Sequence, residues 1–416
     1  MAQFIQQVRG SKNRSKVDAS VVMNIVIIDL FLNKNSPVGS CILQEIKGIS
    51  TTYQLTVLSS YLELKDKSRL AFHKVRIPSQ PNFLRYLMFY YVVKAKMFFL
   101  LRKMRQTNGE KTIVQATSGQ YAKCDVCHTQ FCHAAYLKKH WHKVDVKGIR
   151  KFLRKLNHSF NSWKEKKAFS NAKLIVVPSR DLRQELEKHY PSTTEKLVII
   201  PNPVDTASFK RNYEIGESQR KTLGFGTEDT VIAFAALGDF ERKGLGLLLE
   251  ALAMLKENQL NYKILVVGGR PPEISLFKRK ATRLGVSGQV VFTGFQTDIR
   301  PFLWASDMFS LPSIYEAFSL VCIQAAAAKL PLLVTNISGV NEYVVDNENG
   351  WFVERSATAI AAKLREIYAN KSELDAMGIC AEKTANRYSQ EVFQERWRNL
   401  YSTLAKKDAI VDAQEL

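Results

Sequence analysis

The chain is poor in cysteine, with six among 416 residues. Secreted disulfide scaffolds are short and rich in cysteine, so this class is excluded, and we expect a reducing, cytoplasmic compartment. Long apolar runs are also missing. The most apolar stretch, residues 82–105, is interrupted by Arg85, Lys94 and Lys96, which leaves no window of the roughly 20 apolar residues that a transmembrane helix needs. Residues 1–22 are polar, and we expect a weakly ordered extension there.

Acidic residues are scarce in the first half of the chain. Residues 1–200 contain 35 Lys and Arg against 13 Asp and Glu, whereas the remainder contains 25 against 26. The positive excess of the whole chain, +21 at pH 7, therefore belongs to the first half. This asymmetry makes nucleic acid, an anionic membrane surface or an acidic substrate candidate partners of that half, beside a basic face that binds nothing.

Two stretches carry much of this charge. Residues 82–105 predict a long helix that either covers one face of a sheet or lies in a membrane interface. Residues 138–167 are basic, with aromatic and aliphatic residues at mostly helical spacing. They predict an amphipathic helix that suits a membrane surface or a polyanion, or one that packs on a sheet with a wet basic side. Both stretches are the expected contacts of a protein attached peripherally to the inner face of a membrane.

Apolar runs at regular intervals predict the fold. Strand-like runs such as MNIVIIDLFL (from Met23) and AKLIVVPS alternate with helical segments, and a second series begins with TVIAFAALG. This order predicts an α/β fold with two facing, doubly wound Rossmann-like domains and a cleft between them. We place the domains at residues 23–205 and 206–385, with a polar, irregular linker from Thr206 to Asp229. The last helix, about 386–405, is expected to join the first domain because Trp397 and its neighbours need a partner.

A cysteine and histidine cluster follows the predicted strand TIVQATSG. Cys124, Cys127 and His128 spell C-x-x-C-H, a haem-attachment spacing. If the segment up to Phe131 is a strand, the two cysteines point to opposite faces, and no metal or haem site is expected. A histidine at the carboxyl edge of a parallel strand lies instead where such sheets bind ligands. His133 fits that position best, and His128 is the alternative.

Residues 310–353 predict an anion site. A strand to Leu311 is followed by a turn, a small-residue helix that begins near Phe318, and strands at 332–335 and 350–353. The amino terminus of a helix presents unpaired N–H groups, which suit a diphosphate. Glu316 precedes this helix, and Gln324 lies eight residues further on.

The segments GDFERKG (238–244), PNPVD (201–205) and EAFSLVCIQAAAAKLPLL (316–333) resemble the family 4 retaining glycosyltransferases of the two-domain GT-B fold, a part of the group 1 glycosyltransferases. The resemblance covers residues 23–401. It implies that the amides of Phe318, Ser319 and Leu320 receive the diphosphate of a nucleotide-sugar. It also implies that Lys243 clamps this diphosphate. The family usually has an arginine where this chain has Asp239, and Arg242 is the candidate substitute.

The resemblance assigns further roles. Glu316 faces the hydroxyls of the donor sugar, and Gln324 replaces a glutamate that bonds the ribose. His133 or His128 lies near the reacting carbon, and Gly39 lies on a loop that approaches the phosphates. The remaining donor-binding positions are turns at Gly238, Gly269, Gly294 and Phe295.

The implied activity is a retaining hexosyl transfer from a nucleotide-diphosphate-sugar to a hydroxyl of a glycan, a lipid-linked glycan or a small molecule, as in polysaccharide biosynthesis. No metal and no cofactor are expected. Two alternatives remain: a polyanion- or nucleic-acid-binding protein that uses the basic half, and a family member with impaired donor binding. No recognised nucleic-acid module is present, so nucleic acid is not the expected partner.

Overall fold

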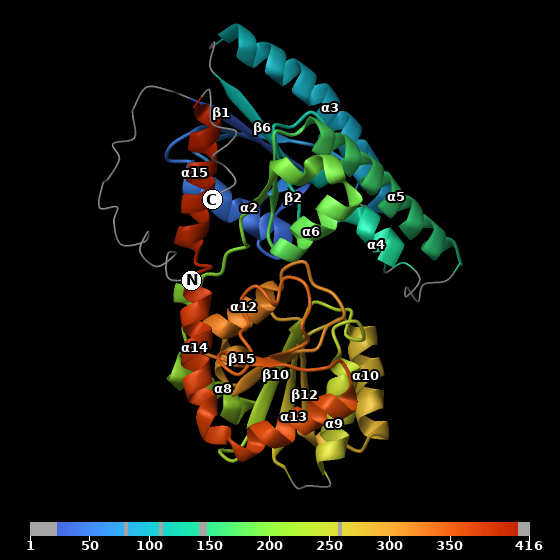
Figure 1. Cartoon of the computed structure of the whole chain (residues 1–416), viewed down its shortest axis with the longest axis vertical. Helices are drawn as coiled ribbons and strands as arrows, with labels where there is room; N and C mark the ends of the chain where they lie inside the picture. Colours follow the sequence, from blue (N-terminus) through green and yellow to red (C-terminus); the bar gives the residue numbers. More distant parts are fainter. Residues whose placement is uncertain are drawn as a thin grey trace.

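The computed structural model describes residues 23–78, 82–107, 111–139, 141, 148–256 and 260–406. These residues form two α/β domains that lie one above the other in Figure 1. The predicted extension, residues 1–22, and part of the predicted basic helix, residues 140 and 142–147, lie outside the described residues.

A parallel sheet forms the centre of the N-terminal domain. One of its inner strands, Asn24–Ile28, is buried at every residue, as a parallel strand covered on both faces requires. In register, Ile27 lies between Val57 and Gln115 of the neighbouring strands. In the described residues the sheet has the order β5-β3-β1-β6-β7-β8-β9. The strands are β1 (Asn24–Ile28), β3 (Gln54–Ser59), β5 (Leu70–Lys74), β6 (Thr112–Thr117), β7 (Val126–His128), β8 (Leu174–Val177) and β9 (Leu197–Ile199), beside a small pair, β2 (Phe31–Leu32) and β4 (Tyr61–Leu62).

Helices cover both faces of this sheet. They are α2 (Pro37–Ile49), α3 (Asn82–Thr107), α4 (His133–Lys139), α5 (Gly148–Asn171) and α6 (Arg180–His189). Helix α2 begins where Ser36 accepts a hydrogen bond from the Gly39 amide at 3.2 Å, with Pro37 in the first turn. Helix α3 buries Phe89, Val93 and Met97 against the sheet. Among the described residues, none of the helices has both the length and the hydropathy of a membrane span.

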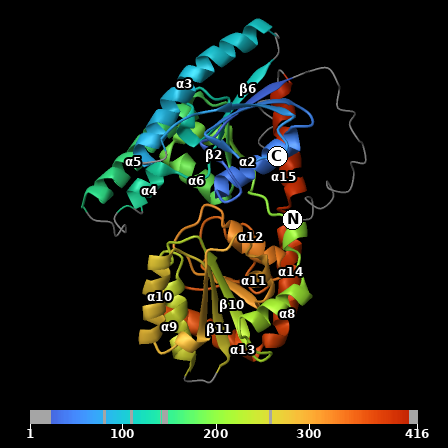
Figure 2. The ribbon, with the colours of Figure 1, turned by 180° about the vertical axis from the view of Figure 1, so that it is seen from behind.

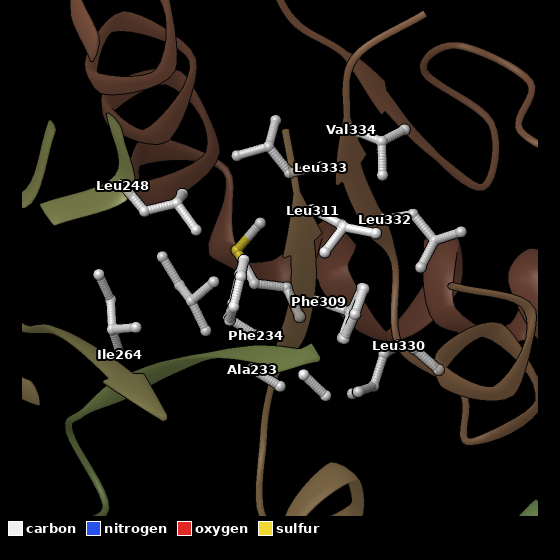
Figure 3. Close-up of a cluster of buried hydrophobic side chains, with 14 of the residues drawn as sticks. Ala233, Phe234, Leu248, Ile264, Phe309, Leu311, Leu330, Leu332, Leu333 and Val334 are labelled. Carbon is white, nitrogen blue, oxygen red and sulfur yellow. The ribbon is translucent and has the colours of Figure 1, made fainter. Parts of the chain in front are cut away.

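A second parallel sheet forms the C-terminal domain, in the order β12-β11-β10-β13-β14-β15 within the described residues. Its strands are β10 (Thr230–Ala236), β11 (Tyr262–Gly268), β12 (Val290–Gly294), β13 (Met308–Leu311), β14 (Leu332–Val334) and β15 (Gly350–Phe352). Figure 3 shows Phe234, Phe309 and Leu332 from adjacent strands in one buried cluster. The helices are α7 (Thr206–Phe209), α8 (Tyr213–Thr222), α9 (Leu245–Lys256), α10 (Pro271–Arg283), α11 (Arg300–Trp304), α12 (Leu320–Ala327), α13 (Ala357–Ala369) and α14 (Leu374–Asn386). The predicted fold class is confirmed.

The last helix, α15 (Gln390–Ala405), returns to the N-terminal domain and packs beside α2, as both views show (Figures 1 and 2). Its residues Phe393, Trp397 and Tyr401 are buried there. The Tyr401 hydroxyl donates to Glu45 Oε1 at 2.9 Å, and Gln115 Nε2 donates to Glu45 Oε2 at 2.9 Å. A buried carboxyl group thus joins α2, β6 and α15.

Three local predictions were wrong. Residues 206–229 contain α7 and α8 rather than an irregular linker, because α8 is a short polar helix that carries no long apolar stripe. The single helix predicted over 138–167 is replaced by α4, which ends at Lys139, and α5, which begins at Gly148. The strand predicted up to Phe131 is only the three residues of β7.

The buried Glu45 makes stability depend on pH. Burial raises the pKa of Glu45 to about 8, although hydrogen bonds from Gln115 and Tyr401 act in the opposite direction. The folded state therefore keeps a proton that the unfolded chain has released, and the free energy of unfolding falls as the pH rises from about 5 to about 8. We expect Glu45→Gln to remove this component, so that the wild type loses stability relative to the variant over this range in urea unfolding. Glu217→Gln, on the exposed face of α8, is the control, and a difference independent of pH would show that Glu45 is ionised in the fold.

Candidate functional site

The carboxyl edges of the two sheets face a shared cavity of about 950 Å³. The C-terminal domain lines it with the segments after β10, β11 and β12 and with the first turn of α12. The N-terminal domain contributes one side of α2, which lies across the domain boundary from α12 (Figure 1). Open parallel sheets bind their ligands at this edge. The cavity is therefore the candidate site.

Lys243 and Glu316 form an ion pair in the wall of this cavity, with Nζ 2.6 Å from Oε1. Ser313 Oγ donates to the same carboxylate oxygen at 3.1 Å, and Arg242 Nη1 lies 3.5 Å from it. The side chains of Lys243 and Glu316 are only 15% and 13% exposed. Such shielding strengthens the attraction and holds both groups in one arrangement.

The tight loop after β10 brings Lys243 to Glu316. Asp239 has a left-handed φ of 64°, and Gly244 has a φ of 87°. A Cβ atom at Gly244 would lie 2.3 Å from the carbonyl oxygen of Pro312, so glycine is needed for the loop to approach the segment before Glu316. The sequence GDFERKG thus positions the lysine through its backbone.

Arg242 lies in the same wall. Its Nε donates to Asp239 Oδ2 at 2.6 Å, and its Nη1 donates to the carbonyl oxygen of Tyr315. Burial disfavours the charged guanidinium, but Glu316 and Asp239 outweigh this effect and raise the pKa of Arg242. Two cationic groups are therefore adjacent at this point of the cavity.

The amino terminus of α12 opens on the cavity. Phe318, Ser319 and Leu320 line it, and so does Gln324 one turn into the helix. Ser319 is the N-cap residue, and its side chain makes no capping hydrogen bond. The first amides of a helix have no partner within the helix, so this end suits an anion. The helix begins at Leu320, two residues later than the sequence predicts.

The predicted glycine turns differ in their relation to the cavity. Gly238 and Phe295 line it, and Gly294, with a φ of 72°, precedes Phe295 in the turn. Gly268 lines the cavity in place of Gly269, whose missing side chain leaves room for a buried phenylalanine ring.

Gly39 does not line the cavity. It belongs to the first turn of α2, and a Cβ atom there would lie 2.4 Å from the carbonyl oxygen of Phe31. This glycine permits close packing of α2 on the preceding turn. Its neighbours Pro37 and Ser40 face the cavity instead.

The two candidate histidines lie elsewhere. His133 lines a second cavity, of about 390 Å³, inside the N-terminal domain, with Nδ1 2.9 Å from His158 Nδ1. Burial and the neighbouring His158 lower the pKa of His133 to about 3. His128 is fully buried, its ring 5.2 Å from that of Trp397, and burial lowers its pKa to about 4. Neither histidine lines the cavity between the domains.

The second cavity adjoins the first. The rings of Phe131, which lines the second cavity, and Tyr315 lie 6.2 Å apart, and Tyr315 directly precedes Glu316. Pro37 lines the interdomain cavity, and the next residue, Val38, lines the second cavity. A molecule in the second cavity would therefore be close to Glu316.

The prediction that Cys124 and Cys127 point to opposite faces was wrong. Cys124 precedes the short strand β7, and both thiols lie in the same hydrophobic cluster. Cys127 Sγ donates to the Ser118 carbonyl oxygen at 3.2 Å, and burial raises the pKa of Cys127 well above its usual value. In the part of the chain that the structure describes, no three His, Cys, Asp or Glu side chains are placed to hold a metal ion.

Several charged residues of the cavity were missed from the sequence, among them Lys34, Lys47 and Arg300. Arg300 Nη2 lies 2.6 Å from Asp298 Oδ2, in the loop after β12. Lys47 follows Ser40 and Gln44 at helical spacing along the exposed side of α2. This spacing was a readable signal, but which side of α2 faces the other domain is decided only by packing.

Two family models match the chain. The model described as "Glycosyltransferase Family 4" matches residues 52–208, and the model described as "Glycosyl transferases group 1" matches residues 216–384. Among curated relatives, a D-inositol 3-phosphate glycosyltransferase of Corynebacterium urealyticum is 28% identical over 252 residues, or 58% of this chain and 59% of its own length. The lipopolysaccharide glucosyltransferase WaaG of Escherichia coli is 29% identical over 184 residues, or 43% of this chain and 48% of its own length.

Solved structures share the fold. The crystal structure of WaaG has a TM-score of 0.72 at 20% identity and covers 90% of this chain and 99% of its own. Anabaena HepE, in complex with UDP-glucose, has a TM-score of 0.68 at 17% identity and covers 91% and 99%. The group 1 model covers the cavity-forming segments of the C-terminal domain, whereas α2, which lines the cavity from the N-terminal domain, precedes the start of the family 4 model. The chain belongs to the group 1, family 4 glycosyltransferases of the GT-B fold.

Proposed function

We propose that this chain transfers a sugar from a nucleotide-diphosphate-sugar to a hydroxyl group of an acceptor. The observation that carries the proposal is the Lys243–Glu316 pair beside the amino terminus of α12, in the wall of the interdomain cavity. A cation and a helix amino terminus suit a diphosphate, and a carboxylate next to them suits the hydroxyls of the attached sugar.

The departing diphosphate gains negative charge as its bond to the sugar breaks. Lys243, Arg242 and the amides at 318–320 are the groups that would stabilise this charge, in a site that needs no metal for the purpose. The new bond forms between the acceptor oxygen and the anomeric carbon on the same face, and the leaving phosphate oxygen takes the acceptor proton. The anomeric configuration is retained.

The acceptor would approach from the N-terminal domain. The cavity that contains His133 adjoins the interdomain cavity and is lined by amides, hydroxyls and the Phe131 ring, which are groups that bind sugars. WaaG is a lipopolysaccharide glucosyltransferase, and the corynebacterial relative acts on D-inositol 3-phosphate. A glycan, a lipid-linked glycan or a small polyol is accordingly the proposed acceptor class.

Nucleotide binding can be tested without knowing the acceptor. A ligand at about 100 times its dissociation constant stabilises the folded state by roughly 2.7 kcal/mol. We expect one of UDP, GDP and ADP to raise the melting temperature of the chain, and UDP is tried first because HepE was solved with UDP-glucose. The absence of a shift with all three would contradict the proposed donor site.

Replacing Lys243 tests the diphosphate clamp. We expect Lys243→Ala to lower kcat/KM for transfer or donor hydrolysis by about 100-fold or more, because removal of one preorganised donor at a developing charge costs that much. The rate is measured in EDTA, which also tests the metal-free reaction. Lys280→Ala is the matched control, because Lys280 also pairs with a carboxylate, Glu250 Oε1 at 2.8 Å, but lies outside the cavity. Equal rates for the two variants would refute the assignment.

Gln324 is where this chain departs from the family pattern. A hydrogen bond from a hydroxyl to a carboxylate is stronger than one to an amide oxygen, by about 1 kcal/mol. We expect Gln324→Glu to tighten nucleotide-sugar binding about fivefold in calorimetry, with Gln219→Glu on α8 as the charge control. Unchanged affinity would show that position 324 does not bond the ribose, and a donor that binds only the variant would indicate impaired binding in the natural chain.

A further inference from the structure

Helix α3 has two apolar faces, and only one of them is covered. Phe89, Val93 and Met97 are buried against the sheet. On the opposite side, exposed residues recur every three or four positions over the length of the helix. They are Leu84, Met88, Tyr91, Ala95 and Phe98, followed by Arg102 and Arg105. Phe98 is 64% exposed and Phe99 beside it is 70% exposed, which is unusual for side chains of this size.

Helix α5 carries a second exposed apolar stripe. Ile149 and Phe152 are 69% and 61% exposed, and Leu156 and Trp163 continue the stripe at helical spacing. The Lys167 ammonium group lies over the Trp163 ring, 4.0 Å from its centre. An apolar stripe with a cation at its border is the pattern of a helix at a membrane interface.

The two stripes are linked through Tyr90, a buried residue whose ring lies 6.5 Å from Trp163 of the α5 stripe and 5.4 Å from Tyr91 of the α3 stripe. Helices α3 and α5 lie along the same flank of the N-terminal domain in both views (Figures 1 and 2). A groove of about 1030 Å³ lies where they join, lined by Tyr91, Phe98 and Phe99 among others. Its cationic residues are Lys94, Arg102, Arg105, Lys123 and Lys167. The exposed stripes, the groove and these cations form one surface, called here the α3–α5 face.

The charge of this face has one sign. Helix α3 contains six Lys and Arg and no Asp or Glu. Helix α5 contains seven Lys and Arg, of which Lys164 is buried, and a single acid, Glu165, which is fully buried. The face therefore combines exposed aromatic rings with an uncompensated positive charge.

We propose that the α3–α5 face docks on an anionic lipid bilayer. A duplex nucleic acid would account for the lysines and arginines but not for Phe98, Phe152 and Ile149, which have no role on its phosphate backbone. The bases of a single strand can stack on phenylalanine rings, but this does not account for the exposed aliphatic residues Leu84, Met88 and Ile149. A second copy of the chain would bring positive charge against positive charge. An anionic bilayer satisfies both features, because the rings enter the headgroup region while lysine and arginine bind the lipid phosphates. The proposal does not depend on the proposed glycosyl transfer, because binding of the chain to lipid vesicles can be measured without any transfer reaction.

The first experiment uses the full chain and extruded vesicles of phosphatidylcholine, with and without about 30% phosphatidylglycerol. We expect flotation with the anionic vesicles, weaker binding to the neutral ones, and partial release in 0.5 M salt, roughly the range where surface charges are screened. A blue shift of the Trp163 fluorescence, absent in Trp163→Phe, should accompany binding. Equal recovery with both vesicle types, or none with either, would overturn the proposal.

Paired variants separate the two contributions. Phe98→Ser with Phe152→Ser should weaken partitioning by at least about tenfold, since each removes a large exposed apolar side chain. Its control is the double variant Tyr213→Ser and Leu276→Ser, which removes similarly exposed residues of the C-terminal domain.

The charge contribution is tested by a second pair of substitutions. Lys94→Glu with Lys167→Glu should weaken binding to anionic vesicles by roughly 25-fold, about fivefold for each lost lysine, with Lys221→Glu and Lys371→Glu as control. Circular dichroism confirms that each variant is folded.

Two other occupants of the face would give different results. Duplex DNA is the first alternative. If it bound the natural chain and the phenylalanine variants equally well but bound the lysine variants more weakly, the face would be a polyanion site and the proposal would fail. If light scattering showed a dimer that the phenylalanine variants dissociate, the face would be an interface between copies, and the proposal would fail as well.

Discussion

The two crossings of the chain between its domains are hydrogen-bonded to each other, and the rest of the structure depends on this point. In the described residues the chain passes to the C-terminal domain near Val204 and returns near Ser389, and the Val204 amide donates to the Tyr388 carbonyl oxygen at 2.8 Å. Beyond it, α15 is anchored in the N-terminal core by Trp397 and Tyr401. Any rotation of one domain against the other must bend both crossings at one place, which keeps the carboxyl edges of the two sheets facing each other.

This arrangement divides the candidate site between a preformed part and a movable part. Lys243, Glu316 and the first turn of α12 all belong to the C-terminal domain, so a change in the angle between the domains leaves their arrangement intact. Several contacts that cross the boundary are polar, such as Ser179 Oγ donating to the Ala317 carbonyl oxygen at 3.0 Å and Asn341 Nδ2 donating to Asp181 Oδ2 at 3.0 Å, beside the ring contact of Phe131 with Tyr315. Interfaces of this kind between domains permit relative motion.

The N-terminal domain combines a conventional core with an unusual flank. Its parallel strands are buried on both faces, and α3 and α15 close the two sides. Of the net +22 of residues 1–200 (35 Lys and Arg against 13 Asp and Glu), α3 and α5 carry +12 (13 against 1), outside this core. More than half of the charge asymmetry seen in composition therefore lies on two adjoining helices.

Periodicity and punctuation in the sequence determined the two parallel sheets, the return of the last helix and the anion site at the α12 turn beside Glu316. Each depends on local patterns, since buried strands read as continuous apolar runs. The place of Lys243 at this site came from the resemblance to the family, and the close approach of Gly244 to Pro312 that allows it is a tertiary contact. Only the tertiary structure decided that His133 faces His158, that Gly39 serves packing, and that Lys34 and Lys47 reach the cavity. Which side of a helix meets the other domain depends on contacts between residues far apart in the chain, and local spacing carries no record of them.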